Sequence, residues 1–221
     1  MRYFISDTHY IGGDYQSDNI LNWERNQFSN KEEHNAAIDK MFYNLVKKIK
    51  PGDEVYHLGD IGNPVYMSFI NSLINKKDGR SILVMGNHDR HEDIEYLRTI
   101  FDIVYPYPVY LSNKLVISHH PVNVWPSQLN VHGHLHGLKL NSPNHICCSI
   151  NDVGYKPISD KQIAAAFSKL PKFSTRFLEE PWANMYQVIS RETDSLIVDE
   201  NKVIDISATK AYRKAINYKG K

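Results

Sequence analysis

Five short blocks of Asp, Asn and His residues stand out because each follows an apolar run, in order along the chain. The blocks are Asp7-Thr8-His9, Gly59-Asp60, Gly86-Asn87-His88-Asp89, Ser118-His119-His120 and Gly133-His134-Leu135-His136. Carboxylate, carboxamide and imidazole groups are ligands of hard and borderline divalent cations. Two such cations about 3.5–4 Å apart form a recurrent device for hydrolysing phosphate esters. Together the blocks predict a hydrolytic site with two metals.

The apolar run before each block predicts a buried strand. These runs are residues 3–5, 55–58, 82–85, 115–117 and 129–131. A side chain at the end of a strand is held rigidly while its tip projects into the crevice where α/β sheets bind ligands. Asp7 and His9 are two residues apart, so in an extended chain they point to the same side. His134 and His136 have the same spacing, and we expect each pair to hold metal together.

Helices are predicted around these strands. A helix before residue 50 is indicated by a capping box of Ser29 and Glu32, by Pro51-Gly52 at its end, and by apolar residues recurring on one face. Others are expected over residues 66–75, 92–100 and 160–170, the last capped by Ser159 with Gln162. After Asp102 strand-like segments dominate, including residues 146–148. The pattern predicts an α/β fold: a sandwich of two mixed β-sheets flanked by helices.

Composition describes an ordinary globular protein and leaves the partner to be argued from the site. The chain has 221 residues, 42% hydrophobic and 23% charged, with a formal net charge of +1. Such a balance gives no overall basic field for nucleic acid, and no apolar run approaches membrane-spanning length. The apolar start is too short for a signal peptide. Cys147 and Cys148 are adjacent, which indicates no disulfide framework, so a reducing, cytoplasmic location is expected.

Domain organisation is predicted from the change in pattern near Pro171. Residues 1–170 are expected to form the functional domain, and residues 171–221 a C-terminal extension of unknown role that could pack on it. Segments 186–189, 195–198 and 203–206 could form a small meander, followed by a basic tail. The spacing predicts no oligomeric state.

In their order and residue types the five blocks resemble the motifs of the calcineurin-like metallophosphoesterase superfamily, over about residues 1–158. Tyr56-His57-Leu58-Gly59-Asp60 and His119-His120-Pro121 further resemble a compact branch of small phosphoesterases frequent in bacteria and phages. The resemblance implies a four-layer sandwich and a hydrolase with two divalent cations, Mn²⁺ first, with Fe, Zn²⁺ or Ni²⁺ as alternatives. It implies that one metal is held by Asp7, His9 and His136, the other by Asn87, His119 and His134, and that Asp60 bridges them.

The same resemblance implies a mechanism. A hydroxide shared by the two metals attacks phosphorus in line, and metal coordination lowers the pKa of water from about 15.7 to near 7. His88 then protonates the leaving oxygen or stabilises its charge. Asp89 orients His88 and stabilises its charge.

Departures from the resemblance bear on the substrate. Protein phosphatases of the superfamily follow the Gly-Asp block with Asp-Arg, whereas Asp60 is followed here by Ile61-Gly62-Asn63. A dianionic monoester benefits from a bidentate guanidinium, so its absence favours phosphodiesters, with a nucleotide or nucleic-acid-derived substrate as the leading hypothesis. Arg90, Arg25 or Arg80 could substitute, and the long loop over residues 10–28, with Trp23 and Arg25, is expected to select substrate.

Two alternatives stay open from the sequence. One is a phosphomonoesterase that uses the same site. The other is a binding scaffold that has lost catalysis, against which the intact ligand set argues.

The remaining histidines divide into two classes. His57, His132 and His120 adjoin ligand blocks, so they either support the ligands or pack in the core. His34, His91 and His145 lie in polar stretches and are expected on the surface.

Overall fold

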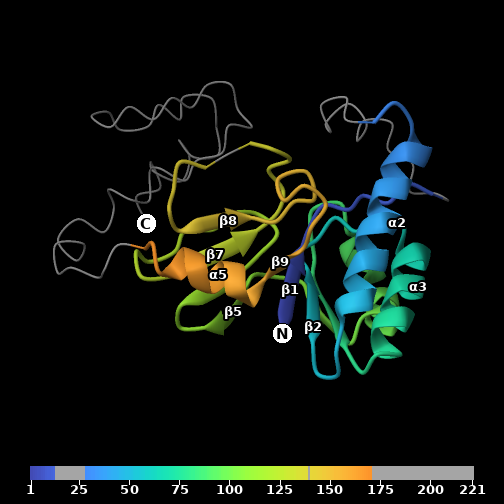
Figure 1. The fold of residues 1–221 in the computed structure, drawn as a ribbon, viewed down its shortest axis with the longest axis horizontal. Coiled ribbons are helices and arrows are strands. Elements are labelled where there is room, and N and C mark those ends of the chain that lie inside the picture. Colours follow the sequence, from blue (N-terminus) through green and yellow to red (C-terminus); the bar gives the residue numbers. More distant parts are fainter. Residues whose placement is uncertain (13–27, 139, 171–221) are drawn as a thin grey trace, which may run out of the picture. The chain divides into compact units, whose positions relative to one another are not determined.

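Two β-sheets form the framework of the computed structural model, which describes residues 1–12, 28–138 and 140–170 (Figure 1). The first has the order β4-β3-β2-β1-β9, in which β1 to β4 are parallel and β9 is antiparallel to β1. The second has the order β5-β6-β7-β8, in which β6 to β8 are parallel and β5 is antiparallel to β6. The strands are β1 (Arg2–Ile5), β2 (Glu54–His57), β3 (Arg80–Val84), β4 (Ile103–Tyr105), β5 (Val109–Ser112), β6 (Leu115–Ile117), β7 (Leu129–His132), β8 (His145–Cys147) and β9 (Ile158–Ser159).

Helices begin where the local sequence can satisfy their first N–H groups. The helices are α2 (Lys31–Lys48), α3 (Pro64–Asn75), the 3₁₀ turn η1 (His91–Asp93), α4 (Ile94–Ile100) and α5 (Asp160–Phe167). Asn30 caps α2 by accepting from the Glu33 N–H at 2.9 Å, so the predicted box of Ser29 and Glu32 is wrong by one residue. The capping box predicted for α5 is confirmed, although the helix ends at Phe167.

Successive side chains along the strands of the first sheet point to opposite faces, and each face contributes to a different hydrophobic core. Ile5, Val55 and Leu83 belong to a core shared with α2, α3 and α4. Their neighbours Phe4, Tyr56 and Ile82 belong to a core shared with β6, β7 and Ile163 of α5. Figure 1 shows α2 and α3 side by side next to β1 and β2. The predicted α/β sandwich of two mixed sheets with helices is therefore confirmed.

The described strands and helices all fall in one compact unit, Met1–Lys139 with Pro143–Pro171. The expected meander and basic tail after residue 170 lie outside the described residues, as do Trp23 and Arg25, so those predictions stay predictions. Among the described helices, none is both long enough and apolar enough to cross a membrane.

Candidate metal centre

The five blocks converge because they follow the carboxyl ends of parallel strands. Three follow β1, β2 and β3 of the first sheet, and two follow β6 and β7 of the second. The sheets meet at this edge: Ser6 N–H donates to the Cys148 carbonyl and Ile150 N–H to the Ser6 carbonyl, each at 3.1 Å. Side chains 129 residues apart in sequence are thereby brought to one site.

A first group of ligands comprises Asp7, His9, Asp60 and His136, whose ligand atoms all lie within 4.8 Å of one another. His136 Nε2 lies 3.3 Å from both His9 Nε2 and Asp7 Oδ1. Asp60 Oδ2 lies 3.5 Å from His9 Nε2. Around a cation with bonds of about 2.0–2.2 Å, neighbouring ligands are about 3.0–3.5 Å apart. These residues fit a divalent cation of that kind.

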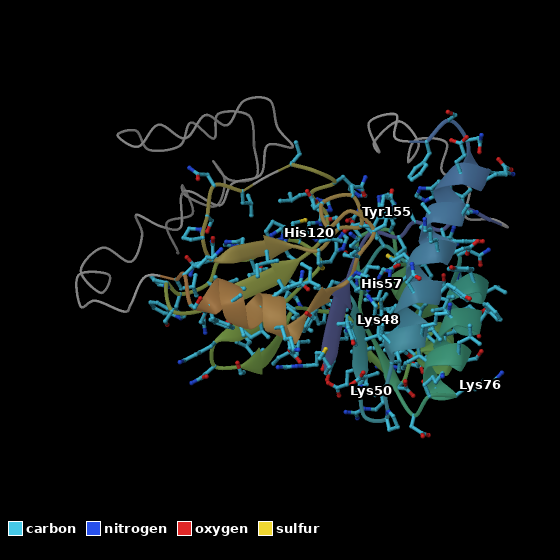
Figure 2. All side chains as sticks on the ribbon, in the orientation of Figure 1. Lys48, Lys50, His57, Lys76, His120 and Tyr155 are labelled. Atoms are coloured by element: carbon cyan, nitrogen blue, oxygen red, sulfur yellow. The ribbon has the colours of Figure 1, made fainter. Side chains whose placement is uncertain are left out.

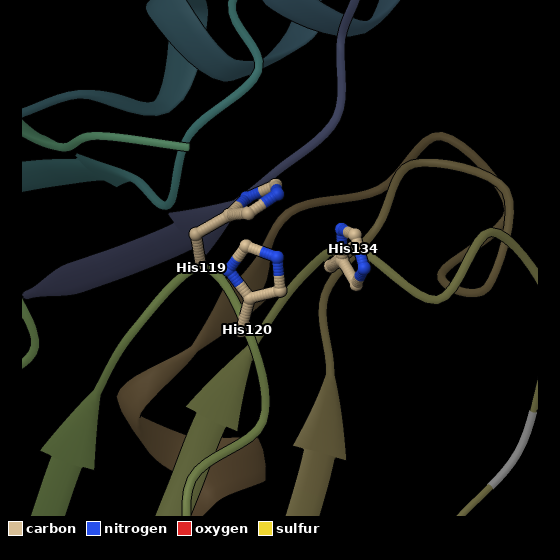
Figure 3. A group of neighbouring side chains, drawn as sticks. All are labelled: His119, His120 and His134. Atoms are coloured by element: carbon tan, nitrogen blue, oxygen red, sulfur yellow. The ribbon is translucent and has the colours of Figure 1, made fainter. Parts of the chain in front are cut away.

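A second group lies on the other side of Asp60. His119 Nε2 is 2.9 Å from Asn87 Oδ1 and 3.3 Å from Asp60 Oδ2. His119 also lies with His120 and His134, and one ring nitrogen of each falls within 4.8 Å of the others (Figure 3). The same carboxylate oxygen of Asp60 therefore faces imidazoles of both groups. His134 and His136 fall in different groups, which agrees with the division of ligands that the family resemblance implies.

The ligands reach the site through backbone turns in the left-handed region. The φ angles are 59° at Asp7, 40° at His9, 58° at Asp60, 71° at His134 and 43° at His136. The expectation that the paired ligands lie in extended chain is wrong for this reason. A non-glycine residue pays roughly 1–2 kcal/mol for this conformation, which persists where surrounding contacts hold it.

Hydrogen bonds hold these turns. Asp7 accepts from the His134 N–H at 2.9 Å and from Ser149 Oγ at 2.7 Å, so a ligand of one group anchors the backbone of the other. His119 Nδ1 lies 2.8 Å from the Leu58 carbonyl, to which it can only donate. That bond leaves the lone pair of Nε2 facing Asn87 and Asp60, the tautomer that a metal ligand needs.

The charge states also suit a cation. Burial lowers the pKa of His9 to about 4, despite the nearby charges of Asp60 and Asp7, so this imidazole is neutral at neutral pH. Burial opposes ionisation of Asp60, but its hydrogen bond to His119 and the nearby histidines hold its pKa below the usual range. Burial likewise opposes a proton on His119, but the bond to Asp60 and the charge of Asp7 raise its pKa to about 9. A cation bound here displaces that proton.

His88 and Asp89 differ sharply in exposure. His88 is exposed, and its ring lies edge-on to that of His9 with centroids 5.3 Å apart. Asp89 is buried and accepts from the N–H groups of Gly86 at 2.8 Å, Asp60 at 2.9 Å and Ile61 at 3.0 Å. Its carboxylate thus ties the loop after β2 to the loop after β3. These contacts indicate a positioning role, and the predicted orientation of His88 by Asp89 stays a prediction.

The arginines considered for the substrate lie in different places. Arg90 is exposed and directly follows Asp89 in the sequence. Arg80 begins β3 and pairs with Glu54 at the start of β2, the end of the sheet opposite to the ligands. The suggestion that Arg80 substitutes for the missing guanidinium is therefore wrong.

Outside the ligand set, three histidines are buried and a fourth is half-buried. His57, which is labelled in Figure 2, is buried with Nε2 2.8 Å from Thr8 Oγ1. Buried His132 has Nδ1 2.8 Å from the Gly133 carbonyl. His34 is fully buried and its Nε2 lies 3.3 Å from the His9 carbonyl. His145 is half-buried, with Nε2 3.0 Å from the Val122 carbonyl. The surface position expected for His34 is wrong, whereas His145 is partly exposed and His91 is exposed as expected.

The helical pattern contained a signal for His34. Ile38, Met41 and Leu45 lie on the buried face of α2, and His34 precedes Ile38 by four residues. Extending the apolar face by one turn would have placed His34 in the core. The next residue, Asn35, holds the backbone of Ile11 with two hydrogen bonds of 2.7 and 3.0 Å. The first turns of α2 therefore clamp the chain that carries His9.

Comparison with known families supports the geometry. A family model described as Calcineurin-like phosphoesterase matches residues 3–187, most of the chain. No curated protein and no solved structure shows a significant match. The matched range contains both ligand groups.

Proposed function

We propose a reaction from one premise: this chain belongs to the calcineurin-like phosphoesterase family. With its cluster of metal ligands, family membership makes it a metal-dependent phosphoesterase. The proposed reaction is the hydrolysis of phosphodiesters of the nucleotide type at a centre for two divalent cations. The observation that carries the proposal is Asp60, whose Oδ2 lies 3.5 Å from His9 and 3.3 Å from His119.

The ligand residues form two cation positions in this proposal. Two cations, when bound, supply a nucleophilic water at neutral pH and positive charge for the phosphate oxygens. Asp60 faces both positions. We assign Asp7, His9 and His136 to one position and Asn87, His119 and His134 to the other. Mn²⁺ is the first expectation, with Fe, Zn²⁺ and Ni²⁺ as alternatives that the same oxygen and nitrogen ligands accept.

His88 is the proposed acid. Its ring is exposed at the open side of the site and adjoins His9, so it can reach the leaving oxygen of a bound ester. Proton transfer to that oxygen relieves the charge that builds as the ester bond breaks. Its exposure keeps it in exchange with solvent protons.

The loop after Asp60 supports a diester substrate. The Ile61 side chain is 2% exposed and belongs to the core, and Asn63 caps α3 by accepting from the Val65 N–H at 2.9 Å. Neither residue offers a guanidinium, which a dianionic monoester would engage more strongly than a monoanionic diester. A small phosphoester or nucleotide is the proposed substrate, since a net charge of +1 provides no broad basic surface. The free thiols of Cys147 and Cys148 support a cytoplasmic location.

Comparing two chromogenic esters tests the proposal. With Mn²⁺ added, bis-p-nitrophenyl phosphate is expected to be hydrolysed faster than p-nitrophenyl phosphate, and chelation should abolish both activities. Asp60→Asn should lose activity together with bound metal. Faster monoester turnover would establish the phosphomonoesterase instead. A wild-type protein that binds metal but is inert across cyclic nucleotides, linear diesters and monoesters would establish the scaffold.

A further inference from the structure

We infer that His120 is an additional ligand of the cation position formed by Asn87, His119 and His134. This inference rests on the proposed two-cation site. His120 lies outside the seven ligands that the family resemblance implies, and it directly follows one of them. It gives that position a third imidazole.

The geometry brings the three histidines together from two loops. The His120 ring lies 4.0 Å from the His134 ring and 4.9 Å from the His119 ring, measured between centroids. One ring nitrogen from each residue lies within 4.8 Å of the other two. Figure 3 shows the three rings gathered beyond the ends of the strands. Bonds of about 2.0–2.1 Å to one cation require the three nitrogens to be about 3.0–3.5 Å apart, so the rings would move closer together when a cation binds.

Buried polar groups hold the turn that carries His120. Ser118 Oγ donates to the His120 carbonyl at 2.6 Å, and Asn130 Nδ2 donates to Ser118 Oγ at 2.9 Å. Asn130 Oδ1 accepts from the Val122 N–H at 2.9 Å, and Ser118 and Asn130 are both fully buried. The backbone of His120 is therefore positioned by its neighbours. Its ring is exposed and lies against the rings of His119 and His134.

The two cation positions consequently differ in ligand chemistry. The first has the carboxylates of Asp7 and Asp60 with the imidazoles of His9 and His136. The second gains a third imidazole from His120 and shares only the Asp60 carboxylate. Imidazole favours Zn²⁺ and Ni²⁺, whereas carboxylate-rich sites favour Mn²⁺ and Mg²⁺. The second position should therefore retain Zn²⁺ more strongly than Mn²⁺, and His120 should be responsible.

Metal titration of three variants tests this inference. His120→Ala is compared with His91→Ala, which removes another exposed histidine. The measurements are Zn²⁺ affinity by competition with a chromophoric chelator and the visible absorption of Co²⁺-loaded protein. We expect His120→Ala to bind one Zn²⁺ as in the wild type and the second at least about 10-fold more weakly, with a weaker Co²⁺ band. His91→Ala should match the wild type in both measurements.

His119→Ala separates failure of this inference from failure of the proposed function. If His119→Ala still binds two cations as tightly as the wild type, the two-cation site itself is wrong. If His119→Ala loses one cation while His120→Ala matches His91→Ala, only the role of His120 is overturned. Circular dichroism and thermal unfolding of each variant establish that the fold is retained.

Discussion

The backbone N–H of His88 donates a 2.8 Å hydrogen bond to Oδ1 of Asp60. The residue proposed as the acid thus supports the carboxylate proposed to bridge the two cations, but through its backbone. The Asp60 N–H in turn donates to Asp89, which also accepts from Gly86. The loops after β2 and β3 therefore form one hydrogen-bonded unit, to which His88 contributes its backbone N–H.

The first prediction separates the ring of His88 from its backbone. His88→Gln should lower kcat by about 10²- to 10⁴-fold while bound metal stays unchanged, because the N–H to Asp60 remains. The loss should be larger for an ester with an alkyl leaving group than for one that releases p-nitrophenolate, which needs little protonation. Kinetics on both esters, with metal analysis, measure this. Equal losses on both esters would show that His88 does not protonate the leaving group.

The second prediction concerns Gly86. A Cβ at this position would collide with the Asp60 carboxylate and lie 2.7 Å from the Asp60 backbone nitrogen. Gly86→Ala should therefore displace Asp60, lower metal affinity at both positions and destabilise the fold by about 1–3 kcal/mol.

Gly52→Ala is the matched control for Gly86. Gly52 has a φ of 81° but nothing within 4 Å of an added Cβ, so alanine there costs stability through backbone strain alone. Metal affinity should fall in Gly86→Ala and not in Gly52→Ala. Equal metal affinity in the two variants would contradict the close approach of Gly86 to Asp60.

The strands and ligand blocks could be predicted from the sequence because both depend on local pattern. Short apolar runs in front of Asp7, Asp60, Asn87, His119 and His134 fall within a residue or two of β1, β2, β3, β6 and β7. Parallel pairing then brings their ends to one edge. The first residue of a helix is harder to predict from the sequence, because neighbouring polar residues such as Ser29 and Asn30 can both serve as caps.

Side-chain grouping could not be derived from residue spacing, because it depends on backbone turns and distant contacts; only the family resemblance divided the ligands between two metals. The left-handed φ of His134 and His136 turns residues two apart toward different groups, which an extended chain would not do. The burial of His34 depends on the His9 segment, 25 residues earlier, packing against α2. The local sequence carries no signal for either the turns at His134 and His136 or the packing of His34, except the helical spacing of His34.

The third prediction tests the clamp formed by α2. Asn35 accepts from the Ile11 N–H and donates to its carbonyl, so Asn35→Ala should free the chain after His9. Each lost hydrogen bond should cost about 1 kcal/mol. We expect a several-fold fall in metal affinity at the position that uses His9, and a lower free energy of unfolding. Asn35→Asp keeps only the acceptor and should be intermediate. Lys40→Ala, on the exposed face of the same helix, should have no effect; unchanged metal affinity in Asn35→Ala would refute the clamp.

The fourth prediction concerns acid stability of the metal-free protein. Burial lowers the pKa of His57 to about 3 and that of His132 to about 4, against about 6.5 in the unfolded chain. Thr8 Oγ1 donates to the Ile61 carbonyl at 2.9 Å, so His57 donates its Nε2–H to Thr8, and burial keeps the ring neutral. Both histidines therefore stabilise the fold fully above pH 6.5. That contribution is lost as the pH falls toward 4 and the unfolded chain takes up protons.

Replacing His57 isolates its part of this pH dependence. With chelator present, the free energy of unfolding should fall below pH 6.5 by up to about 1.4 kcal/mol per pH unit for each such histidine. His57→Leu is similar in size and has no titratable proton. Between pH 6.5 and 4 it should lower the slope of the unfolding free energy against pH by the amount that corresponds to about one proton taken up on unfolding. His91→Ala, which keeps both buried histidines, should leave it unchanged. Denaturant unfolding across this pH range measures the slopes. A group that takes up its proton equally in the folded and unfolded states adds nothing to the slope. Parallel curves for wild type and His57→Leu would therefore show that His57 takes up its proton in the folded protein.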